Sequence, residues 1–102
     1  MRYKFQKDLG KYSIKAAEAE LTRIRTALQP FQPVEQERFV TRCTHTTIFA
    51  IGDIAIYSHI TGSEKNLEEK VVYQTSSFAL VTTPKKTRLP TDLHLALEKL
   101  YE

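Results

Sequence analysis

The sequence of 102 residues lacks tryptophan and contains one cysteine, one methionine and three glycines. A single cysteine cannot form a disulfide within the chain, which argues against a small disulfide-stabilised secreted domain. No glycine-rich phosphate-binding loop, nucleophile elbow or paired-cysteine metal site is present. Enzymes that need these devices are therefore excluded, and the sequence predicts no catalytic residue, no metal and no cofactor.

Long apolar runs are also missing. No basic start followed by an apolar stretch marks a signal peptide or a membrane span, so we expect a protein that is cytoplasmic or otherwise intracellular and has no membrane partner. The content of 41% hydrophobic and 26% charged residues is ordinary for a folded chain. This length predicts a single domain over residues 1–102, and the net charge of +3 favours anionic partners.

Two segments have the apolar spacing of amphipathic helices. Ser13 is placed to cap a helix that ends before Pro30. Its apolar residues follow at intervals of three and four: Ile14, Ala17, Leu21, Ile24 and Leu28. Thr91 is predicted to cap a second helix, whose apolar residues also share one face: Leu93, Ala96, Leu97, Leu100 and Tyr101.

The strongest strand signal lies in Thr46–Ile60, where two β-rich runs flank Gly52-Asp53. Such a pair between two strands is typical of a two-residue hairpin turn. The turn predicts three cross-strand pairs on one face: Ile51 with Ile54, Phe49 with Ile56, and Thr47 with Ser58.

The other strands rest on weaker patterns. Residues 38–44 are predicted as a strand and residues 61–69 as a loop. Residues 70–74 and 78–82 are either two strands or, as we favour, one strand bent at residues 75–77. Residues 1–11 form an edge strand or a basic arm. The fold class is α+β, with an antiparallel sheet of three to five strands and an N-terminal and a C-terminal helix, in the order α-β-β-β-(β)-α.

The second face of the hairpin is not polar, although a half-solvated sheet normally alternates between apolar and polar residues. The core face carries Phe49, Ile51, Ile54 and Ile56, whereas the opposite face carries Ile48, Ala50, Ala55 and Tyr57. Either a helix or a second copy of the chain must cover the latter four residues. They are the predicted partner face, and they indicate a homodimer.

Basic residues gather near both ends of the sequence. Lys85, Lys86 and Arg88 precede the second helix, whose N-terminus adds a partial positive charge. Arg2, Lys4, Lys7 and Lys11 join them in one anion-binding strip if the two termini approach each other. A solvated loop that keeps the protein soluble is the alternative interpretation.

Cys43 and His45 lie two residues apart, so both would point to one face of a strand. No third or fourth metal ligand and no orienting acid stands at a recognisable spacing from them. We therefore interpret Cys43 as a buried structural cysteine rather than a nucleophile.

Acidic residues and a lysine in the middle of the chain resemble the pattern of a nuclease superfamily. Asp53 precedes Glu68 and Lys70, and Glu18 or Glu20 lies on the earlier helix. This arrangement resembles the acid, acid-x-lysine pattern of the restriction-endonuclease-like superfamily over residues 18–74. The resemblance implies carboxylates that hold a divalent metal and a lysine that positions water. The sequence departs from it because Glu68 and Lys70 end a loop, and because a turn itself favours Asp53.

We conclude from the sequence that this is a small, non-catalytic accessory or adaptor protein that binds another macromolecule, through a homodimer. A protein partner, including a second copy, ranks ahead of nucleic acid because the two-faced apolar hairpin is a stronger feature than the basic excess. Nucleic-acid binding through the basic segments is the first alternative, and a metal-dependent nuclease is the second.

Overall fold

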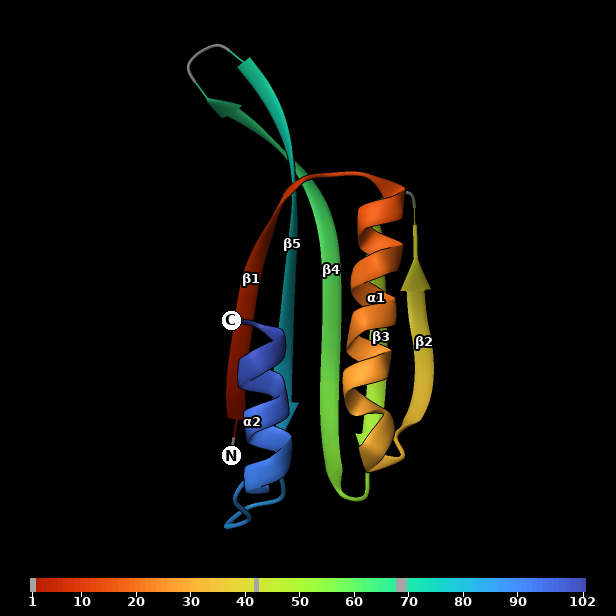
Figure 1. The fold of residues 1–102 in the computed structure, drawn as a ribbon, viewed down its shortest axis with the longest axis vertical. Helices are drawn as coiled ribbons and strands as arrows, with labels where there is room; N and C mark the ends of the chain where they lie inside the picture. The colour runs from red at the N-terminus through yellow and green to blue at the C-terminus, as the bar shows by residue number, and fades with distance from the viewer. Residues whose placement is uncertain (1, 42, 68–69) are drawn as a thin grey trace.

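The computed structural model describes residues 2–41, 43–67 and 70–102. Five antiparallel strands form one sheet in the order β1-β5-β4-β3-β2 (Figure 1). The elements are β1 (Arg2–Lys11), α1 (Ile14–Leu28), a short 3-10 helix (Gln29–Phe31), β2 (Val34–Val40), β3 (Thr44–Ile51), β4 (Ile54–Leu67), β5 (Lys70–Thr82) and α2 (Thr91–Leu100). The predicted α+β class is confirmed.

The predicted helix-first order is wrong, because the chain begins with strand β1. Tyr3 and Phe5 of β1 are half-buried, whereas Arg2 and Lys4 between them are exposed. This alternation matches the two-residue period of a strand, and β1 pairs along one edge of the sheet with β5. Of the two alternatives for this segment, the edge strand is therefore the one observed.

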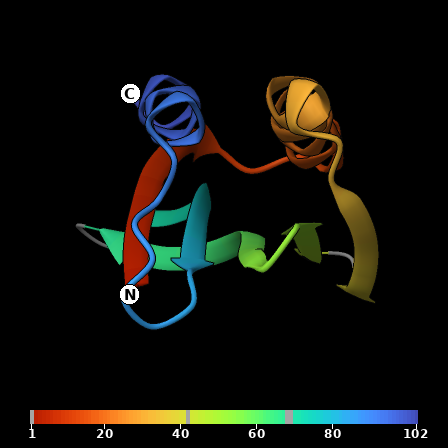
Figure 2. The ribbon, with the colours of Figure 1, turned by 90° about the horizontal axis from the view of Figure 1, so that it is seen from below.

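Both helices lie on the same face of the sheet (Figure 2). Helix α1 links β1 at one edge to β2 at the other, and α2 returns over the side where β1 and β5 lie (Figure 1). Phe5 on β1 contacts Tyr101 at the end of α2, with ring centroids 6.1 Å apart. In the described part of the chain, no helix or strand covers the other face, which we call the open face.

The core lies between this pair of helices and the sheet. Phe49 and Ile56, which the hairpin turn predicted as a pair, are paired and fully buried. Leu28 of α1 and Leu97 of α2 are buried in the same cluster. Because each such side chain contributes about 1.5–3 kcal/mol when it leaves water, these contacts hold both helices on one face.

Two predicted strand boundaries are wrong. The predicted strand at residues 38–44 spans two strands, because β2 ends at Val40 and β3 begins at Thr44, where the Thr41 amide donates to the Thr44 carbonyl at 2.8 Å. The predicted loop at residues 61–69 is instead strand to Leu67, because the β4–β5 ladder continues there despite the polar composition. Residues 68 and 69 lie outside the described residues.

The single strand predicted across residues 75–77 is confirmed, since β5 is continuous there. The irregularity lies on the neighbouring strand, between Asp8 and Gly10 of β1. Close by, the ring of Tyr12 lies against Gly62, where an added Cβ would come within 2.3 Å of Tyr12 Cδ2. Gly62 therefore makes room for the chain as it leaves β1 toward α1.

The two helices begin differently. Ser13 caps α1 as predicted, and its hydroxyl accepts from the Ala16 amide at 3.0 Å. Thr91 does not cap α2: Pro90 is the cap residue, and no side chain makes a capping hydrogen bond. A proline at this point fixes φ at a value suited to entering the helix, which explains why a side-chain cap is dispensable.

Replacing these two residues tests the difference. Ser13→Ala should lower the free energy of unfolding by about 1 kcal/mol because the Ala16 amide loses its acceptor. Thr91→Ala, the matched control, should change it by less than about 0.5 kcal/mol. Urea denaturation followed by circular dichroism measures both. Equal losses in the two variants would contradict the assigned caps.

Candidate functional site

The open face is built from the strand positions that alternate with the core positions. Residues paired across strands share a face, so the register defines its members. They are Arg2, Lys4, Gln6, Asp8, Lys11, Val34, Gln36, Phe39, Thr44, Thr46, Ile48, Ala50, Ala55, Tyr57, His59, Thr61, Gln74, Ser76, Phe78, Leu80 and Thr82. The predicted partner face, Ile48, Ala50, Ala55 and Tyr57, lies at its centre. Of the two covers expected for it, the helices are excluded because both lie on the other side.

Three aromatic rings form a cluster on β4, the central strand of the sheet, and on its neighbour β5. Tyr57 and His59 on β4 have nearly parallel rings, with centroids 6.1 Å apart and an interplanar angle of 9°. Phe78 on β5 lies 5.1 Å from the His59 centroid and 6.2 Å from that of Tyr57. All three residues are half-buried. The cluster thus has accessible surface at the middle of the sheet.

His59 is fixed within this cluster by a neighbour on β3. Its Nδ1 lies 2.8 Å from the hydroxyl of Thr46, a residue that is only 4% exposed. Burial lowers the pKa of His59. The neutral imidazole is therefore favoured at neutral pH, and the positive charge of the open face comes from lysine and arginine.

Those cations lie along the β1 border of the face. Lys4 Nζ stands 5.7 Å from the centre of the Phe78 ring, a distance at which the cation is attracted to the π face. Arg2 lies two residues earlier on the same face. Lys11 pairs with Gln74, beside the buried Thr75, and so lies on the open side at the far end of β1. Lys7 pairs with Ser77, which is buried beneath α2, and so points toward the helices.

The basic connection between β5 and α2 extends this border. It carries Lys85, Lys86 and Arg88, all exposed. The Leu89 amide donates to the Tyr3 hydroxyl at 3.4 Å, which ties the connection to β1. Figures 1 and 2 show it beside the N-terminal end of β1. Five of the predicted anion-binding residues therefore lie at one corner of the sheet, where the N-terminal end of β1 meets the β5–α2 connection. Lys11 lies at the other end of β1, and Lys7 points to the helix side.

Most of the acidic side chains that the structure describes lie away from the open face. Among the side chains that the structure describes, Asp8 is the one acid on the open face. Glu35 of β2 faces the helices, where it accepts from Arg25 Nε at 2.7 Å. The other acids whose side chains are described lie on α1, on or just after α2, on the helix side of β2 or in the β3–β4 turn: Glu18, Glu20, Asp92, Glu98, Glu102, Glu37 and Asp53.

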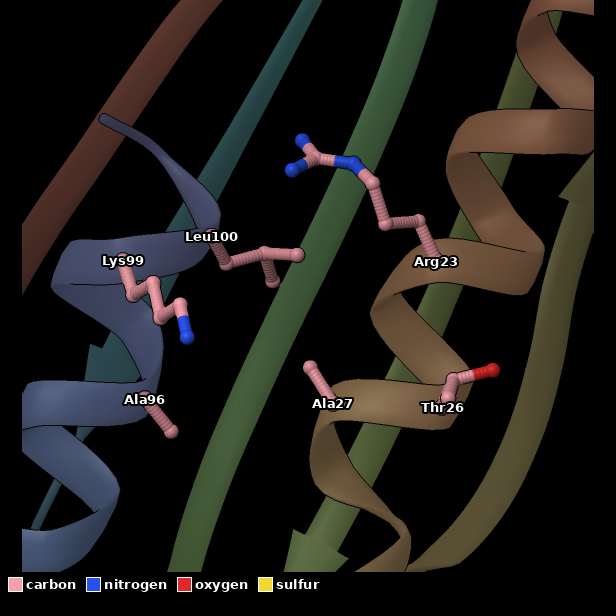
Figure 3. A pocket seen from close by; sticks show the side chains of 6 residues that line it. All are labelled: Arg23, Thr26, Ala27, Ala96, Lys99 and Leu100. Carbon is pink, nitrogen blue, oxygen red and sulfur yellow. The ribbon is translucent and has the colours of Figure 1, made fainter.

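A groove of about 590 Å³ lies on the opposite surface, between α1 and α2 (Figure 3). Ala27 and Ala96 point toward each other across it, and Arg23 and Lys99 extend at its rim. Arg23 already binds the buried carboxylate of Glu20, with contacts of 2.8 and 3.0 Å. That pairing raises the pKa of Arg23 and neutralises its charge within the molecule.

The residues of the nuclease pattern are not brought together. Asp53 precedes the first residue of β4, whereas Lys70 pairs with its last residue, Leu67. Glu68 lies outside the described residues, and Glu20 is buried and paired with Arg23. Within residues 2–41, 43–67 and 70–102, no three histidine, cysteine or acidic side chains gather to hold a metal. Cys43, predicted to be buried, is exposed because it lies between β2 and β3.

Sequence reasoning missed His59 and Phe78. The hairpin alone placed His59 on the outer face, but its proximity to Phe78 depends on the pairing of β4 with β5, which the sequence did not predict.

Among the described helices, none has the length and apolar composition needed to cross a membrane. Comparisons with protein-family models, curated proteins and solved structures found no match. The site itself must therefore carry the functional argument.

Proposed function

We propose that this protein is a non-catalytic nucleic-acid-binding protein whose ligand lies on the open face of the sheet. One observation carries the proposal: the face is asymmetric, with a basic border at β1 and the β5–α2 connection, and an aromatic and apolar centre. A nucleic acid has the complementary chemistry, because it presents a row of phosphates beside a row of aromatic bases.

The electrostatic part of the proposal rests on where the charges lie. Arg2 and Lys4 stand at the end of β1 nearest the β5–α2 connection, so five basic side chains share one corner. Each phosphate that such a residue neutralises releases condensed counterions, which makes binding depend on salt. A net charge of only +3 is sufficient for this purpose because the acids are concentrated on the helix side.

A homodimer through the same surface is the second candidate, and exposed apolar residues on β2 favour it. Val34 is 72% exposed and Phe39 is 57% exposed, both at the edge of the open face. A second copy would cover them, which makes dimerisation favourable. It ranks below nucleic acid because a second copy offers few acids to meet Arg2 and Lys4.

Charge reversal at the corner tests the first proposal. Lys85→Glu with Arg88→Glu should weaken binding of a labelled oligonucleotide and lower the slope of log K against log salt by roughly 1 to 2 units, because two phosphate contacts are lost. Lys86 is left unchanged because its φ of 70° adds a separate backbone constraint. Fluorescence polarisation over a salt series measures both effects.

The matched control is Lys15→Glu with Lys99→Glu, which makes the same change in net charge on the helix side. It should retain most of the affinity and the slope. Equal weakening in both double variants would show that only net charge matters. Absent or salt-independent binding would refute the proposal.

Sedimentation equilibrium at tens of micromolar separates the two candidates. The nucleic-acid proposal predicts a monomer of 11.8 kDa. The homodimer predicts twice that mass, with dissociation in Val34→Glu and Phe39→Glu variants because a buried carboxylate without a partner is costly. A monomeric wild type would remove the second candidate.

A further inference from the structure

We infer that the ligand is single-stranded and that two of its bases stack on Tyr57 and Phe78. This inference rests on the proposed function and adds the strandedness of the ligand and the residues that contact its bases. It starts from the position of the two rings: they lie on the central strand β4 and on its neighbour β5, and no described helix or strand covers them.

A duplex cannot use such rings. In a double helix the faces of the bases are stacked on one another, and a protein reaches only base edges and phosphates. A duplex laid on the open face would set phosphates against Tyr57, Phe78 and Leu80 and would leave the aromatic surface without a matching partner. A single strand exposes its base faces, which stack on aromatic side chains.

The spacing of the groups fits one strand lying across β1, β5 and β4. Neighbouring strands of a sheet are about 5 Å apart, so Phe78 lies about one spacing and Tyr57 about two spacings from the basic border at β1. Lys4 Nζ lies over the Phe78 ring, 5.7 Å from its centroid, so a phosphate bound by Lys4 lies beside this ring, and the base of that nucleotide takes the place of the ammonium group over Phe78.

The distance between the rings favours two separate stacking sites. Their centroids are 6.2 Å apart and tilted by 38°, whereas bases stacked on each other are about 3.4 Å apart. Two bases held by Tyr57 and Phe78 are thus pulled out of contact with each other. The ring of His59 completes a triangle with these two rings, 6.1 Å from Tyr57 and 5.1 Å from Phe78, and the Thr46 hydroxyl holds it in place.

The test compares a labelled single strand of about 12 nucleotides, within the roughly 4–16 that one sheet-based site spans, with the duplex of the same sequence. The single strand should bind at least about tenfold more tightly, because only it can stack on the rings. Tyr57→Leu and Phe78→Leu should each weaken single-strand binding by about 5- to 150-fold. The salt slope should stay unchanged, since no phosphate contact is lost.

Three controls separate stacking from a structural effect. Tyr57→Phe keeps the ring and should keep the affinity, and thermal unfolding verifies that each variant is folded. Phe31→Leu makes a similar change on the half-buried aromatic that packs against the core, away from the open face, and should bind as the wild type does. Loss of affinity in Phe31→Leu equal to that in Phe78→Leu would overturn the assignment of the rings.

The remaining outcomes distinguish this inference from the proposed function. If single strand and duplex bind equally and the leucine variants bind as the wild type does, the inference is wrong. The proposed function still stands in that case, provided that Lys85→Glu with Arg88→Glu weakens binding. If neither oligonucleotide binds, both fail.

Discussion

Burial of one sheet face by both helices is the constraint on which the rest of this structure depends. Phe49 and Ile56 from the sheet, together with Leu28 and Leu97 from the helices, form a single apolar layer with almost no exposed surface. The described part of the chain has two α-helices, and both pack against this layer. The opposite sheet face is therefore left in solvent, whatever its composition.

The consequence is a molecule with two different surfaces. The helix surface holds most of the acids whose side chains are described, and two of them are paired with neighbouring arginines, Glu20 with Arg23 and Glu35 with Arg25. The open face keeps its cations at one border and its aromatic rings at the centre. The positive charge of the open face is therefore concentrated along one border, although the net charge of the protein is small. Cations at a border beside aromatic rings are groups that a single-stranded nucleic acid can bind.

Local signals in the sequence predicted much of this fold. The Gly52-Asp53 turn fixed the hairpin register because a two-residue turn leaves only one pairing, and Ser13 marked the start of α1 because a capping hydroxyl acts within three residues. The extension of β4 to Leu67 was not predictable in the same way, since polar residues are held in the strand by pairing with β5 rather than by their own preference. Thr91 was misassigned because Pro90 already sets the entry to α2.

The candidate site was predictable from the sequence only where its residues lie within one local hairpin. Ile48, Ala50, Ala55 and Tyr57 were found because one local hairpin contains them all. Phe78 and Phe39 reach the open face only through the pairing of β5 and β2 with that hairpin, and no local pattern encodes those contacts. The convergence of Arg2 with the β5–α2 connection also depends on the pairing of β1 with β5, in which Arg2 pairs with Thr82, far along the sequence.

The most direct measurement of the central claim is a nuclear magnetic resonance titration of the isotope-labelled protein with a short single-stranded oligonucleotide. The account predicts that the largest changes in amide chemical shift occur at Tyr57, Phe78 and residues 85–88, while the amides of α1 change little. Changes concentrated on Arg23, Ala27 and Lys99 would place the ligand in the groove between the helices instead. That result would contradict the account.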